Sequence, residues 1–143
     1  MLTFAEMKFI EAEAQLALGQ TGPAYTAYLA GIQASMDKYD VDPTAADAYL
    51  NDPVVAVGAA ALTNELIMKE KYIALYFNYE VWTDMRRYNY SSDVYRNFVI
   101  PDTDLFGGPA QRALYPTDEF NRNGAEVSKV VRDFETQMWR DLN

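Results

Sequence analysis

The feature that most constrains the fold is a stretch of about 30 residues, 58–88, that contains no proline. It is rich in alanine and long apolar side chains, and these surround much of a helix instead of forming one stripe. We therefore expect a central helix that other elements contact on more than one side. Asn78 offers a break, after which Glu80–Arg87 forms a second short helix with Trp82 and Met85 turned inward.

Two helices precede this stretch. Thr3 and Glu6 have the T-x-x-E spacing of a capping box, so a helix is expected over Phe4–Leu18. A second helix is predicted from Pro23 to Met36, because proline suits the first turn and apolar residues follow at helical spacing. The short connection requires an antiparallel hairpin, which is similar in length to a tetratricopeptide unit.

The remaining segments are less regular. A short helix is expected to start at Asp42 and Pro43 and to end at Leu50. Residues 89–124 are rich in turn formers and predict a long ordered loop, in which VYRNFVI (94–100) could give a short strand. A C-terminal helix is expected over 125–141. The prediction is therefore an all-α fold in a single domain, 1–143, with a loop-rich region before its last helix.

Composition excludes several classes of function. The chain has 21 acidic and 12 basic residues, and its net charge of −9 would repel nucleic acid. It has no histidine and no cysteine, which removes the usual zinc ligands, thiol nucleophiles and serine–histidine triads. Its apolar stretches, such as Val54–Leu62, are too short to cross a bilayer. We expect no metal, no cofactor and no catalysis.

Some residue groups could nevertheless form a site. Glu80, Trp82, Asp84, Arg86 and Arg87 lie within two helical turns, but such helical ion networks are usually structural, and that interpretation is favoured. Pairs of carboxylates suitable for glycoside hydrolysis exist, as expected by chance among so many acidic residues. Asp102 and Asp104 fit a solvated turn better than a calcium loop.

Three tyrosines in and before the long loop are the candidate ligand-binding residues: Tyr88, Tyr90 and Tyr95. A tyrosine ring can stack on the C–H face of a sugar while its hydroxyl bonds a polar group, and it loses little entropy in doing so. The alternative, that each ring simply seals the loop onto the helices, is the favoured interpretation for each ring taken alone. Both interpretations stay open from the residues alone.

Several segments contain sequence motifs that one known family has in the same order. Phe4–Ala14 (FAEMKFIEAEA) resembles the opening helix of that family, and Ala27–Met36 resembles its Y-x-x-G-I-x-x-S-M helix. The most specific match is Ile67–Phe77 (IMKEKYIALYF) followed by Glu80–Arg87 (EVWTDMRR), which is similar to I-x-x-Q-K-Y-I-A-L … E-x-W-x-D-x-R-R. Residues 111–123 and 136–141 are similar to its R-x-x-Y-P-x-x-E-x-x-x-N and T-x-x-W-W-D motifs.

On these motifs the chain resembles the C-terminal part of SusD/RagB-like proteins, which are outer-membrane nutrient-binding lipoproteins. It departs at Glu70, where glutamine is usual, and at Arg140, where a second tryptophan is common. The resemblance implies non-catalytic glycan binding beside a SusC-like TonB-dependent transporter. It also implies a surface-exposed outer-membrane location and a lipid anchor upstream of residue 1.

An alternative from another class is a tetratricopeptide-like protein–protein interaction module with no sugar binding. In that case the helical hairpin would hold a partner protein. The sequence upstream of residue 1 would separate the two hypotheses, because a lipid-anchored cysteine favours the first and further helical repeats favour the second.

Overall fold

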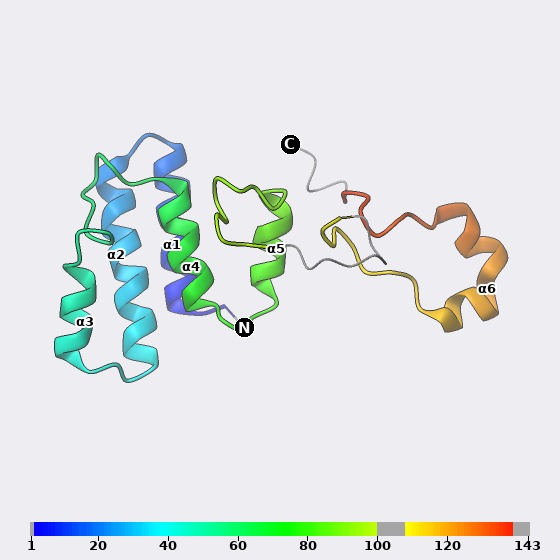
Figure 1. The fold of residues 1–143 in the computed structure, drawn as a ribbon, viewed down its shortest axis with the longest axis horizontal. Helices are drawn as coiled ribbons and strands as arrows, with labels where there is room; N and C mark the ends of the chain where they lie inside the picture. Colours follow the sequence, from blue (N-terminus) through cyan, green and yellow to red (C-terminus); the bar gives the residue numbers. More distant parts are fainter. Residues whose placement is uncertain (1, 100–107, 139–143) are drawn as a thin grey trace.

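The computed structural model describes residues 2–99 and 108–138. Over these residues the chain is all-helical, as predicted, with α-helices and turns but no strand (Figure 1). The helices in this part of the chain are α1 (Phe4–Ala17), α2 (Thr21–Lys38), α3 (Pro43–Leu50), α4 (Asn64–Ala74), α5 (Glu80–Arg87) and α6 (Thr117–Val130). None of them combines the length and apolarity that a membrane crossing requires, among the residues the structure describes.

The predicted helical hairpin is confirmed in α1 and α2. The Thr3 hydroxyl accepts the N–H of Glu6 at 3.1 Å, and the Glu6 carboxylate accepts the N–H of Thr3 at 3.4 Å, which completes the capping box. Gly19 has a φ of 73° and allows the chain to turn back. α2 begins at Thr21, two residues before the proline taken as its start.

The hydrophobic core lies between α1, α2 and α4. Phe9, Tyr28 and Ile67 are completely buried there, one from each helix. Gly31 lets α1 and α2 approach closely, because a Cβ at this position would lie only 3.0 Å from the Phe9 ring. The central position expected for the helix that contains Ile67 is therefore confirmed for α4.

α3 begins as predicted. The Asp42 carboxylate accepts the N–H groups of Thr44 at 3.0 Å and Ala45 at 3.2 Å, and Pro43 occupies the first turn. Leu50 is the last residue of the helix.

The helices within the stretch 58–88 cover less of it than its composition suggested. Gly58 has a φ of 80° and residues 59–61 form a turn, so α4 begins only after the N-cap Thr63. The predicted break is confirmed, because α4 ends at Ala74 and the Asn78 side chain accepts the N–H of Glu80 at 3.1 Å. α5 then spans the predicted residues.

Two predictions after α5 are wrong. The last helix of the described residues is α6, which begins after Pro116 and ends at Val130, and not a helix over 125–141. The loop predicted over 89–124 is therefore also too long, because 117–124 are helical. Proline followed by acidic residues in the first turn is a helix start. Residues 131–138 are not helical, since the Phe134 carbonyl accepts the N–H groups of Gln111 at 3.1 Å and Arg112 at 3.3 Å. The end of the predicted helix, 139–141, lies outside the described residues.

The second wrong prediction is the short strand. The described part of VYRNFVI, 94–99, forms turns, with bonds such as that from the Phe98 N–H to the Tyr95 carbonyl at 3.0 Å. No neighbouring segment in the described chain offers a ladder of hydrogen bonds to it, and a strand without a partner leaves its backbone groups unpaired.

Figure 1 shows how these elements are arranged. The bundle of α1–α4 lies at one end, α6 lies apart from it at the other, and α5 stands between them beside α4. α5 is thus the helix on which the two parts meet.

Candidate functional site

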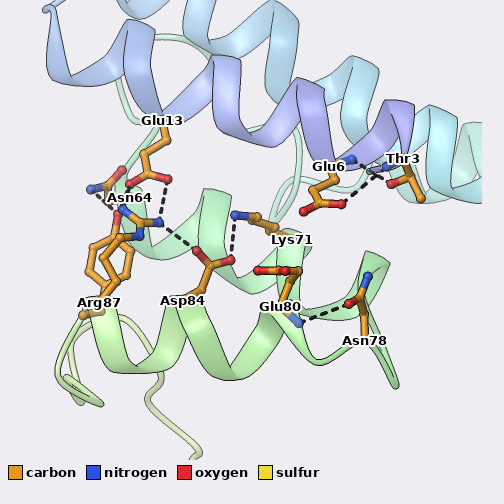
Figure 2. Close-up of polar contacts among 10 residues, drawn as sticks. Thr3, Glu6, Glu13, Asn64, Lys71, Asn78, Glu80, Asp84 and Arg87 are labelled. Atoms are coloured by element: carbon orange, nitrogen blue, oxygen red, sulfur yellow. Dashed lines mark hydrogen bonds and ion pairs between the residues drawn. The ribbon is translucent and has the colours of Figure 1, made fainter. Parts of the chain in front are cut away.

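One face of α5 carries an ionic network that joins three helices (Figure 2). The Asp84 carboxylate accepts from the Lys71 ammonium of α4 at 2.6 Å and from the Arg87 guanidinium at 2.9 Å. Arg87 also forms a two-pronged contact with Glu13 of α1, with one N–O distance of 2.9 Å, and the Tyr88 hydroxyl donates to Glu13 at 2.6 Å. The network connects α1, α4 and α5.

The charges in this network are strongly desolvated. The Lys71 side chain is only 6% exposed, and its Asp84 partner is also buried. Burial alone would raise the pKa of Glu13, but the hydrogen bonds from Arg87 and Tyr88 outweigh it and lower that pKa below its ordinary value. The ion pairs of α5 therefore hold the bundle together, as the structural interpretation of this block predicts.

The opposite face of α5 holds the distal part of the chain. The Trp82 indole N–H donates to the Tyr90 hydroxyl and to the Ala110 carbonyl, each at 2.9 Å. Arg86 stacks on the Trp82 ring, with its guanidinium carbon 4.2 Å from the centroid, and donates to the Gln111 carbonyl at 3.2 Å. Met85 is buried as predicted, whereas Trp82 is 37% exposed, so the inward position predicted for its indole is wrong. Polar partners at the surface hold this ring.

A groove of about 600 Å³ lies between α4, α5 and the segment 94–99. Its walls combine apolar and aromatic side chains with a rim of polar and charged ones. The lining residues are Glu65, Lys69, Tyr72, Ile73, Met85, Val94, Tyr95, Arg96, Asn97, Phe98 and Val99. We call this the α4 groove.

The three predicted tyrosines are not brought together into one site. Tyr95 lines the α4 groove, and its ring meets that of Tyr72 edge-on at 6.5 Å. Tyr90 does not line the groove, and its ring centroid lies 5.7 Å from that of the lining residue Phe98. Tyr88 belongs to the ionic network, where its hydroxyl also accepts from Asn64 at 3.2 Å.

Tyr95 contributes its ring to the groove more than its hydroxyl. The side chain is buried, and the hydroxyl has no hydrogen-bond partner among the described residues. Burial, and next the Asp84 carboxylate, raise the pKa of this phenol. The buried hydroxyl is thus held in its neutral form, and the ring forms part of the floor of the groove.

Other residues of the groove were missed from the sequence. Tyr72 and Ile73 were assigned to a helix that other elements contact on more than one side, yet both are exposed on α4. Phe98 and Val99 were assigned to a strand, and both are exposed in irregular backbone at the end of a turn. A signal for the α4 wall existed, because Lys69 and Tyr72 stand three residues apart on one face of the helix.

The acids of the groove do not resemble a hydrolytic pair. Among the described lining residues Glu65 is the one carboxylate, and it contacts Arg96 at 2.7 Å. Glycoside hydrolysis requires two carboxyl groups across the scissile bond. Within the same part of the chain, no group of three or more His, Cys, Asp or Glu side chains is placed to hold a metal ion.

Comparison with known proteins agrees with this architecture. A SusD-like family, described as "Starch-binding associating with outer membrane", matches residues 1–104, which include α1–α5 and every lining residue of the α4 groove. No curated protein and no solved structure gives a significant match. The match confirms the resemblance found in the motifs of α1, α2, α4 and α5. The chain belongs to this SusD-like family of starch-binding, outer-membrane-associated proteins.

Proposed function

We propose that the chain is a non-catalytic glycan-binding protein and that the α4 groove holds a sugar ring of its ligand. The observation that carries this proposal is the groove itself, in which exposed aromatic faces stand beside a polar rim. The full-length protein would present the glycan to a SusC-like TonB-dependent transporter from a lipid-anchored position on the cell surface. Family membership supports these last steps.

The walls have the chemistry that a sugar requires. Tyr72 and Phe98 expose ring faces to the groove, and buried Tyr95 forms its floor. Aromatic faces pack against the apolar C–H groups of a sugar, and rim groups such as Asn97 can bond its hydroxyls. Of the predicted tyrosines, we assign Tyr95 to this contact and Tyr90 to the support of Phe98; Tyr88 stays a prediction, outside the groove.

Charge favours a neutral sugar. The two cations of the rim are already paired, Arg96 with Glu65 at 2.7 Å and Lys69 with Glu70 at 3.2 Å. The Glu70 carboxylate also accepts from the Tyr49 hydroxyl at 2.9 Å. A uronate or sulfate group would have to displace these partners, and the net charge of −9 would repel a polyanionic glycan.

A protein-interaction function without sugar binding is the second candidate. It is favoured by an exposed apolar row on α1, where Phe4, Met7 and Ile10 recur at three-residue spacing. A row of this kind suits a helical partner. The two functions differ in the surface they use, so variants can separate them.

Calorimetry against a panel of neutral and acidic polysaccharides tests the proposal. Tyr72→Ala and Phe98→Ala should each weaken binding of a neutral glycan at least about tenfold, since each removes an aromatic face. Tyr39→Ala is the matched control, because Tyr39 is also exposed but follows α2 and does not line the groove. Affinity that is unchanged in both groove variants would contradict the proposal, and binding of a peptide partner that is lost in Met7→Glu would support the alternative.

A further inference from the structure

The turn between α4 and α5 presents a pair of aromatic rings to solvent. Tyr76 is 65% exposed and Phe77 is 94% exposed, and their ring centroids lie 4.4 Å apart at an angle of 58°. Tyr79, on the same turn, is also exposed. Bulky aromatic side chains in a soluble part of a chain usually bury most of their surface, so this pair stands out.

The pair continues the wall of the α4 groove. Ile73 lines the groove and is exposed, and its carbonyl accepts the N–H of Tyr76 at 3.2 Å. Tyr76 lies two residues beyond the end of α4, and this i→i+3 bond places it one tight turn further along the chain than Ile73. The exposed groove residues Lys69, Tyr72 and Ile73 of α4 are thus followed directly along the chain by the exposed Tyr76 of the turn.

The backbone of the turn holds the outer ring in place. Phe77 has a φ of 63°, in the left-handed region that large side chains rarely adopt and where glycine or asparagine is more usual. The Asn78 N–H donates to the Leu75 carbonyl at 2.7 Å and closes the turn. Because the Phe77 ring is almost wholly exposed to water, core packing does not offset the energetic cost of this positive φ. Residues with such unfavourable backbone angles are often found at functional positions.

We propose that Tyr76 and Phe77 form an outer subsite that extends the α4 groove, so that the ligand is a linear neutral oligosaccharide longer than one sugar ring. This inference rests on the proposed function of the groove. The wall from Glu65 to Ile73 alone runs about 12 Å along the helix axis, and the turn lengthens it further. A second ring of the ligand would pack on this pair, with the Tyr76 hydroxyl available for its polar groups.

The experiment compares ligand lengths. Binding is measured by calorimetry for ladders of neutral oligosaccharides, from the monosaccharide to the hexasaccharide, built on α-glucan, β-glucan, xylan and mannan backbones. We expect affinity to rise with length. Tyr76→Ala and Phe77→Asn should each weaken the longest bound member about tenfold and change the shortest bound member by less than about twofold. Asparagine is chosen because it tolerates a positive φ, so the turn is retained.

The controls make the outcomes distinct. Tyr39→Ala should change no affinity, and Tyr72→Ala should weaken short and long ligands alike. If Tyr72→Ala weakens all ligands while Tyr76→Ala and Phe77→Asn weaken none, the outer subsite is wrong and the groove stands. If the wild-type chain binds no member of any ladder, the function proposed for the groove fails, and the extension fails with it.

Discussion

The α1–α4 bundle and the distal segment 108–138 are held by different interactions. In the bundle, buried apolar side chains from three helices meet, and Phe9, Tyr28 and Ile67 have no solvent exposure. In the distal segment, Val127 and Gln111 are the buried residues among those described, and the contacts to α5 are mostly hydrogen bonds. The bundle is stabilised mainly by burial of apolar surface, and the distal segment by a few hydrogen bonds.

This difference teaches where stability and recognition reside. Apolar burial contributes about 25 cal/mol per Å² and is spread over many side chains, so the bundle is a rigid base. Hydrogen bonds contribute about 1 kcal/mol each, so the distal segment depends on single donors and acceptors. The α4 groove lies along the edge of the rigid part, which suits a site that must keep its shape.

The largest effect is expected from the core of the bundle. Phe9→Ala should lower the free energy of unfolding by about 4 kcal/mol, because the ring fills the space beside Gly31 and its removal leaves a cavity. Phe120→Ala in α6 is the matched control, since that ring is exposed, and it should cost less than about 1 kcal/mol. Denaturant titration measures both. Equal losses in the two variants would mean that the distal segment has a core of its own.

The next effect tests the attachment of α5 to the bundle. Asp84→Asn should cost about 3 kcal/mol, because it leaves the Lys71 charge buried without its partner at 2.6 Å. Asp118→Asn, at an exposed position of α6, is the control and should leave the midpoint of denaturation nearly unchanged. A neutral result for Asp84→Asn would show that water reaches Lys71.

The pH dependence of stability should be smaller and have a definite sign. The folded pKa of Glu13 lies below its ordinary value of about 4.5, so its contribution is present above that pH and is lost as pH falls through the folded pKa. Glu13→Gln should therefore be less stable than wild type at pH 7, and the difference should shrink below pH 4.5. Thermal melts across this range measure it. A constant difference from neutral to acid pH would contradict the assignment.

The smallest global effect is expected where the distal segment is attached. Trp82→Phe removes the indole N–H that bonds Tyr90 and Ala110, and should cost about 1 kcal/mol or less. Amide exchange should nevertheless accelerate at Gln111 and Arg112, which bond Phe134, and stay unchanged at core amides of α1. Uniform acceleration throughout the chain would mean that the two parts open together.

The sequence predicted the bundle better than the distal part, for a physical reason. The Thr3 capping box, the Asp42 cap and the break at Asn78 are local signals, and each was confirmed. The end of α6 depends on a pairing between Phe134 and Gln111, which are more than twenty residues apart, and no local pattern encodes it. Helical spacing in the segment 131–138 was overridden by this tertiary contact.

The candidate site was predicted only in part for the same reason. Tyr95 was singled out by its residue type, and the structure places it in the α4 groove. Tyr72 was not singled out, because the helix is apolar on most sides and only the packing of α1 and α2 on α4 shows which side remains open. Tyr88 shares the chemistry of Tyr95 but faces Glu13.

Because the two faces of α5 contact different partners, the number of residues between those contacts is fixed. Successive residues of a helix are about 100° apart, so a single inserted or deleted residue between Trp82 and Arg87 would rotate one set of contacts away from its partner. Arg87 could then no longer reach Glu13 while Trp82 still met Ala110. Length changes should be accepted in the exposed segment 113–116 and rejected within α5. The eight residues of α5 therefore fix the orientation of the distal segment relative to the bundle, as well as attaching one to the other.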